Sequence, residues 1–368
     1  MRPGAPLWLA VPSRYARMRP AGARIVLALL LALTVAMMPW PPLMPPRAVE
    51  AATQPGETDV ELYAAIVDRL RHGDDYYAAT AQELRARHFP LRPFVTFRPP
   101  LLARIAARLP PEIVPLLAWL LVAATAVTWL LRLAEALPDR AVRTIAVLLL
   151  AAGLFTATLP AMVVWHELWA GLLIAWSIAL RRPGRWIEAA AIATVAMLIR
   201  ETAALYAVVM ACSAWAEGER REATGWIAAL GVLAIATAAH AWGVAQVVWP
   251  TDPSSGGWTG FNGPAFFAMA LQHVTALAVF PFALVVPVIA LALFGWTAWL
   301  SPLGARMAAT LAAYGLLIAL FARADNFYWG LMTAPVFLAG LLFVPDGLRD
   351  LFAAALDRRR ITVTRVTR

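Results

Sequence analysis

The sequence has no lysine and only one cysteine, Cys212, among 368 residues. A single cysteine can form neither an internal disulfide nor a metal site built from several thiolates. Charged residues are scarce as well, at 14%, whereas hydrophobic residues make up 61% of the chain. These proportions lie far outside those of soluble globular proteins, so the hydropathy pattern decides the class of this protein.

The net charge of +9 comes from arginine alone, because all 31 basic residues are Arg. A basic chain can indicate a nucleic-acid partner, but here the arginines gather at the ends of apolar runs. An excess of basic residues in short loops is typical of the cytoplasmic side of a membrane protein. We therefore expect no nucleic-acid partner and predict a multi-pass protein of the cell inner membrane with both termini in the cytoplasm.

Long apolar runs follow one another along most of the chain. A membrane-spanning helix needs about 20 mostly apolar residues, because backbone amides in hydrocarbon must bond internally. We predict an all-α integral membrane fold, a single transmembrane domain over 1–368 with about ten spans. The runs cover 25–38, 113–131, 143–163, 166–180, 186–199, 202–216, 224–248, 278–299, 306–322 and 327–344.

The first apolar run, Ile25 to Met38, has two interpretations. Arginines precede it and prolines follow it, as expected for a first span that enters from the cytoplasm. The run is short, however, and small residues follow at Ala48 and Ala51, so a cleaved signal peptide is the alternative.

Three regions outside the apolar runs carry further predictions. Residues 46–112 are polar and contain two amphipathic helices, near 60–71 and 76–87, so we expect a structured extracytoplasmic loop. Residues 249–277 begin as a Pro- and Gly-rich loop and continue as a helix that we expect at the outer interface. Residues 345–368 are predicted to form a basic cytoplasmic tail.

Polar residues that are out of place in apolar surroundings fall on the outer side in this orientation. Ionisable groups at membrane depth cost about 2.5 kcal/mol or more, so they usually pair or line a wet cavity. We therefore expect these residues to converge. They are Asp59, Asp74, Asp75, Arg98, His166, Glu167, Arg200, Glu201, Asp252, His273, Arg323, Asp325 and Asn326.

Three motifs occur in order within the long polar region: D-V-E-L-Y at 59–63, G-D-D-Y-Y at 73–77 and R-P-P-L-L at 98–102. This order resembles the first outer loop of the GT-C superfamily. Those multi-span glycosyltransferases use polyprenyl-phosphate-linked sugars and include protein mannosyltransferases and lipid A aminoarabinose transferases. The family has Lys where Arg98 stands, so the charge is kept but the geometry differs. Looser similarity extends to 166–171, 199–201 and 325–330.

The resemblance implies a glycosyltransferase that moves a sugar from a polyprenyl-phosphate donor to a lipid, glycan or protein acceptor. Such transfer needs a base for the acceptor proton and cations for the departing phosphate. By motif position Asp59 is the base, and we add Glu167 as a second catalytic candidate. The donor phosphate would be bound by Arg98, Arg200 and Arg323, with support from Tyr63, Asp74, Asp75, His166, Glu201, Asp325 and Asn326.

Metal dependence stays open at this point. No metal-ligand motif such as H-E-x-x-H occurs, whereas a divalent cation is used by some relatives of the fold and not by others. A divalent cation is therefore a possible cofactor.

Purely structural roles are alternatives for several of these residues. Asp74 or Asp75 could cap the helix that follows, and Glu167 could favour a helix start. Arg200 and Glu201 could pair with one another inside the membrane. At the level of function, a secondary transporter and a non-catalytic GT-C-like subunit of an envelope-assembly complex are the alternatives, although no internal repeat supports a transporter.

Overall fold

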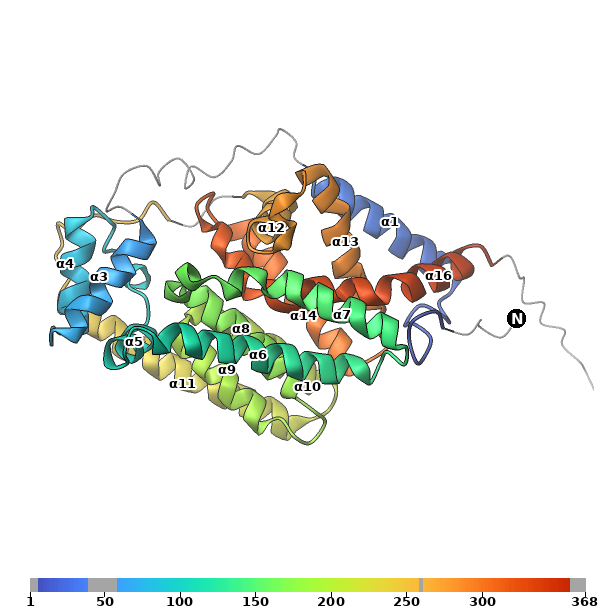
Figure 1. Cartoon of the computed structure of the whole chain (residues 1–368), viewed down its shortest axis with the longest axis horizontal. Helices are drawn as coiled ribbons and strands as arrows, with labels where there is room; N and C mark the ends of the chain where they lie inside the picture. Colours follow the sequence, from blue (N-terminus) through green and yellow to red (C-terminus); the bar gives the residue numbers. More distant parts are fainter. Residues whose placement is uncertain (1–5, 39–57, 258–260, 358–368) are drawn as a thin grey trace, which may run out of the picture.

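The computed structural model describes residues 6–38, 58–257 and 261–357. Within these ranges the chain forms helices and no strand, with only two isolated bridges, Arg92 to Ser254 and Arg182 to Arg185. The all-α prediction is therefore confirmed for the described residues. Figure 1 shows an elongated bundle with α3 (Asp59–Arg71) and α4 (Tyr76–Ala86) at one end and α16 (Val344–Ala355) toward the other.

Several helices are long and apolar enough to span a membrane. By length and composition there are four in the described residues, or five if a pair bent by 52° counts as one span. They are α6 (Ile113–Ala134), α7 with its extension (Arg140–Thr158), α11 (Arg220–Ala245), α14 (Pro302–Phe321) and the bent pair Asn326–Met332 with Ala334–Ala355. The count of about ten spans goes beyond this finding and belongs to the proposal below.

Shorter apolar helices account for the other predicted runs. They are α1 (Pro20–Ala36), α8 (His166–Leu180), α9 (Ile187–Ile199), α10 (Ala204–Ala216) and α13 (Phe282–Ala298). The break expected at Arg200 is present, since the short helix η4 (Glu201–Ala203) separates α9 from α10. Helix α8 is central, with 13 of its 15 residues buried.

The outer helices present apolar side chains on their surface. Leu131 of α6 is 64% exposed and Ile235 of α11 is 74% exposed. Many exposed large apolar side chains of this kind are unfavourable in water and suit contact with lipid. The bundle therefore has a buried core around α8 and an apolar exterior.

Residues 58–112 form a separate helical unit at the end of the bundle. Thr58 begins α3 with a capping box, and Asp75 caps α4 by accepting hydrogen bonds from the backbone N–H groups of Tyr77 and Ala78. The helix η1 (Phe94–Thr96) and α5 (Leu101–Arg108) complete the unit. Helices α3 and α4 match the two predicted amphipathic helices, whereas residues 46–57 of the predicted loop lie outside the described residues.

Helix α12 (Gly263–His273) differs from the interfacial helix expected within 249–277. Eight of its 11 residues are buried, and it packs against α14 and the short helix η6 (Asn326–Met332). An interfacial helix would leave one face open to lipid, whereas protein encloses most of α12.

The expected tail at 345–368 is also partly folded into the bundle. Helix α16 packs against α1 and α13, and its Asp346 accepts hydrogen bonds from the backbone N–H groups of Leu7 and Trp8, each at 2.7 Å. The tail therefore begins after α16, and residues 358–368 lie outside the described residues.

The chain from 326 to 344 is broken into short helical pieces, η6, α15 (Ala334–Phe337) and η7 (Leu338–Phe343), instead of the continuous span expected at 327–344. Backbone packs directly on backbone here. A Cβ added at Gly295 would lie 1.9 Å from the carbonyl oxygen of Gly340, and one added at Gly171 would lie 2.1 Å from that of Leu331. Irregular backbone is tolerated at membrane depth where protein buries it in this way.

This close approach leads to a prediction for Gly295→Ala. The added methyl group must push the η7 backbone away, at a cost of about 1–3 kcal/mol for overpacking. We expect a lower thermal unfolding temperature in detergent. Gly231→Ala in α11 is the matched control, because a Cβ there meets nothing within 4 Å. Equal unfolding temperatures for the two variants would contradict the packing described here.

Candidate active site

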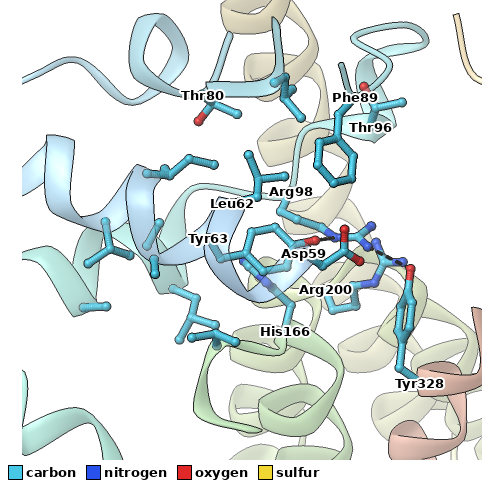
Figure 2. Close-up of a pocket in the computed structure, with 18 of the residues that line it drawn as sticks. Asp59, Leu62, Tyr63, Thr80, Phe89, Thr96, Arg98, His166, Arg200 and Tyr328 are labelled. Carbon is cyan, nitrogen blue, oxygen red and sulfur yellow. Dashed lines mark hydrogen bonds between the residues drawn. The ribbon is translucent and has the colours of Figure 1, made fainter. Parts of the chain in front are cut away.

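A cavity of about 440 Å³ lies between the 58–112 unit and the bundle. Its walls come from α3, the segment before α5, the start of α8, the break after α9 and the segment before and within η6. Figure 2 shows the labelled side chains of Asp59, Tyr63, Arg98, Arg200 and Tyr328 gathered around one space. Eight predicted site residues line it: Asp59, Tyr63, Arg98, His166, Arg200, Arg323, Asp325 and Asn326.

Local structure explains how these side chains reach the cavity. Asp59 is the first residue of α3, and Tyr63 lies one turn later on the same face. Arg98 stands before Pro99 and Pro100, which delay the start of α5. Arg200 has an extended backbone, with φ −142° and ψ 111°, between α9 and η4. Each cation therefore sits at a break in helical structure.

Arg98 is held by hydroxyl groups instead of by a close carboxylate. Its Nε donates to Tyr63 Oη at 2.9 Å, and its Nη2 donates to Tyr328 Oη at 3.3 Å. The nearest carboxylate, that of Glu167, is 3.8 Å from Nη2. Among the described residues Nη1 has no hydrogen-bond partner. Arg98 is thus a largely buried cation, with 13% of its side chain exposed, whose charge is only partly balanced.

Arg200 is buried and paired with two carboxylates. Its Nε lies 2.7 Å from Glu167 Oε1, and its Nη1 contacts Glu201. Glu167 is 1% exposed and does not line the cavity, because it lies behind Arg200 and Arg98. Glu201 lines a second cavity, of about 330 Å³. The Arg200–Glu201 pair anticipated as a structural alternative is therefore present, and Glu167 is placed to orient arginines and not to touch a ligand.

Arg323 lies at the rim of the cavity, with 41% of its side chain exposed. Its Nη2 donates to Asp325 at 3.0 Å and its Nη1 donates to Ser255 Oγ at 3.2 Å. Asn326 accepts a hydrogen bond from the Arg323 backbone N–H and donates one to Tyr328 Oη. This turn therefore connects the rim cation to the tyrosine that holds Arg98.

Asp59 has no hydrogen-bond or ion-pair partner among the described residues. Burial raises the pKa of its carboxyl above the ordinary value, Arg98 opposes the rise, and the negative charges of Glu167 and Asp325 add to it. The carboxylate is thus a stronger base than an aspartate in water and keeps its oxygens available to a ligand.

Four predicted site residues do not line this cavity: Glu167 and Glu201, described above, and Asp74 and Asp75. Asp74 forms an exposed ion pair with Arg69 at 3.0 Å, and Asp75 caps α4. The capping role considered for this pair is therefore confirmed for Asp75. Neither side chain lines either cavity.

The charged groups of the cavity favour an anion as ligand. Four arginines line it, Arg71 in addition to Arg98, Arg200 and Arg323, against the two carboxylates of Asp59 and Asp325. Among the described residues, no three His, Cys, Asp or Glu side chains lie close enough to hold a metal ion together. Arginine is the residue type best suited to bind a phosphate, because its planar guanidinium group can donate two hydrogen bonds to phosphate oxygens.

Some lining residues were not predicted as part of the site. Tyr328 and Trp329 lie within the 325–330 range of looser similarity, but they were not among the residues predicted for the site. Ser255 had no sequence signal beyond its loop. The link from Tyr328 to Arg98 joins residues 230 positions apart, so it becomes visible only in the folded chain.

No family model matches this sequence, and neither a curated protein nor a solved structure matches it. The resemblance to the GT-C superfamily therefore rests on the motifs quoted above. The function has to be argued from the cavity and its residues.

Proposed function

We propose that the protein is a membrane glycosyltransferase that moves a sugar from a polyprenyl-phosphate donor to a lipid, glycan or protein acceptor. One observation carries the proposal: the carboxylate of Asp59, which has no partner among the described residues, shares a cavity with Arg98, Arg200 and Arg323, each from a different part of the chain. In this proposal the chain crosses the inner membrane about ten times, both termini are cytoplasmic, and the cavity opens on the outer side.

A carboxylate beside arginines suits the transfer of a sugar from a polyprenyl phosphate. Asp59 accepts the proton of the acceptor hydroxyl while the oxygen of that hydroxyl bonds to the anomeric carbon of the sugar. The bond from that carbon to the phosphate oxygen breaks, and its electron pair leaves with the polyprenyl phosphate. The phosphate gains one negative charge while Asp59 loses one, so the total charge in the cavity is unchanged. A step that leaves the total charge unchanged suits a partly buried site, because the cavity does not have to stabilise an additional charge away from bulk water.

Arg98 is our principal candidate for the phosphate. Its hydrogen-bond partners are phenolic oxygens, and its Nη1 has no partner among the described residues. A phosphate oxygen near Nη1 would give this cation a closer anionic partner than Glu167, which is 3.8 Å away. Arg200 and Arg323 already contact carboxylates and would contribute mainly through their field. Glu167 then orients Arg200.

A lipid-linked donor also agrees with the walls of the cavity. Val114 and Pro115 of α6 line it, and the neighbouring Leu116 and Leu120 are 46% and 57% exposed on the outer surface of the bundle. A polyprenyl chain leaving the cavity past α6 would therefore remain in hydrocarbon while its phosphate reaches the arginines.

The proposal is tested with the purified protein in liposomes and a radiolabelled polyprenyl-phosphate sugar, with envelope lipids and glycans as acceptors. We expect wild-type protein to move label to an acceptor, and Arg98→Met to lower kcat/KM about 100-fold through loss of a charge-assisted contact to the phosphate. Arg108→Met is the matched control, because Arg108 is an exposed residue of nearby α5.

Two results would count against this assignment. Unchanged transfer by Arg98→Met would remove Arg98 from the phosphate site. Movement of an intact solute across the liposome membrane, without any transfer of label, would favour a secondary transporter.

A further inference from the structure

His166 is a buried polar side chain. It is 3% exposed, and neither ring nitrogen has a hydrogen-bond partner among the described residues. Leaving a buried polar group unsatisfied costs about 1–3 kcal/mol, and native proteins rarely tolerate it without a reason. A ligand that bonds the ring would supply that reason.

The position of His166 points to a ligand in the cavity. It is the first residue of α8 and lines the same cavity as Asp59 and Arg98. Its ring meets Tyr63 edge to face, with centroids 5.1 Å apart, and Figure 2 shows it directed from α8 toward that tyrosine. The next residue, Glu167, pairs with Arg200, so one helix start fixes both the imidazole and an arginine.

A second unsatisfied group lies on the neighbouring element. Trp329 of η6 is 8% exposed and lines the cavity, and its indole Nε1 has no hydrogen-bond partner in the part of the chain that the structure describes. Helices α8 and η6 pack against one another, and the part of the cavity wall that they form includes His166 and Trp329.

The chemistry of these groups differs from that of the arginines. A neutral imidazole offers one N–H donor and one acceptor nitrogen, and an indole offers one donor. A sugar hydroxyl both donates and accepts, so it matches this wall better than a phosphate oxygen, which only accepts. Aromatic rings also provide apolar surface for the C–H faces of a sugar.

We infer that His166 and Trp329 bind hydroxyl groups of the transferred sugar and thereby help to select it. This inference rests on the proposed function, because it assigns the sugar to the cavity whose arginines would hold the phosphate. The part of the donor that contacts His166 and Trp329 is then a neutral, hydroxyl-bearing sugar ring.

The test measures binding of two kinds of lipid to the full-length protein in detergent: farnesyl phosphate alone, and farnesyl phosphate joined to mannose, glucose or galactose. We expect His166→Ala and Trp329→Phe each to weaken binding of at least one sugar-bearing lipid about tenfold, the size of one lost hydrogen bond. Binding of farnesyl phosphate alone should stay the same. His166→Gln, which retains a donor and an acceptor, should lose less.

Matched controls lie outside the cavity: His273→Ala, an exposed histidine on α12, and Trp215→Phe, at an indole that is 59% exposed. Equal weakening of both lipids by His166→Ala would overturn the inference, and so would unchanged binding or failure of every sugar lipid to bind better than farnesyl phosphate. Selective loss of a sugar lipid in a protein that transfers no sugar would support the sugar contact and overturn only the proposed transfer.

Discussion

Asp59→Asn is expected to reduce sugar transfer by about 100- to 10,000-fold, the range for loss of a general base. Asparagine has nearly the same shape but cannot accept the acceptor proton. The measurement is kcat/KM for the labelled donor in liposomes. Asp68→Asn is the control, because Asp68 lies on the same helix with 67% of its side chain exposed.

The same variant should not lose stability. Burial raises the pKa of Asp59 in the folded protein, so folding favours its protonated form. A carboxyl whose folded pKa lies above its unfolded pKa stabilises the protein below the unfolded value, and this contribution is lost as the pH rises through the folded value. At neutral pH the ionised Asp59 is therefore a cost that asparagine removes, and we expect an equal or higher unfolding temperature.

The pH profile of the wild-type protein gives an independent check. In the proposed mechanism activity requires the ionised carboxylate, so kcat/KM should fall as the pH drops through the raised pKa of Asp59, above the value of about 3.9 of an ordinary aspartate. An acid limb that persists unchanged in Asp59→Asn would assign it to another group. Full transfer by Asp59→Asn would remove the base from the proposed mechanism.

Much of the fold could be predicted from the pattern of apolar residues, including α3, α4 and the break at Arg200. Two features could not. Hydropathy treats burial in protein and exposure to lipid alike, so the enclosed position of α12 was not visible. It also does not register backbone geometry, so the pieces around Gly340 were predicted as one continuous span.

The site was predictable only to the level of a shared side of the membrane. The predicted topology puts Asp59, Arg98 and Arg200 on one side of the membrane, and the fold brings them to one cavity. Adjacent residues on a helix point in different directions, however. For that reason the sequence could not separate His166, which lines the cavity, from Glu167, which lies behind it.

The opposite end of α8 is held by a buried ion network. Arg181 donates to Glu222 through Nε at 3.0 Å and Nη2 at 2.6 Å, and Arg306 reaches the same carboxylate at 3.0 Å. Glu217 pairs with Arg306 at 2.6 Å. The side chains of Arg181, Arg306 and Glu222 are at most 4% exposed. One carboxylate therefore joins the end of α8 to the starts of α11 and α14.

Glu222→Ala should be among the most destabilising substitutions in the protein. It leaves two buried guanidinium groups with only the partly exposed Glu217, and breaking a buried pair in this way costs about 3–5 kcal/mol. We expect the thermal unfolding temperature in detergent to fall by about 5–10 °C. Glu135→Ala is the matched control, because Glu135 also joins two arginines, Arg132 and Arg182, but is 50% exposed.

Surface pairs of that kind contribute about 0–1 kcal/mol, so Glu135→Ala should change the unfolding temperature little. Similar decreases in the unfolding temperature of Glu222→Ala and Glu135→Ala would show that burial does not increase the contribution of the Glu222 network to stability. The network also lies far along α8 from His166. Any Glu222→Ala protein that remains folded at low temperature should therefore bind donor lipid as the wild type does, which separates the stabilising end of the helix from the end that lines the cavity.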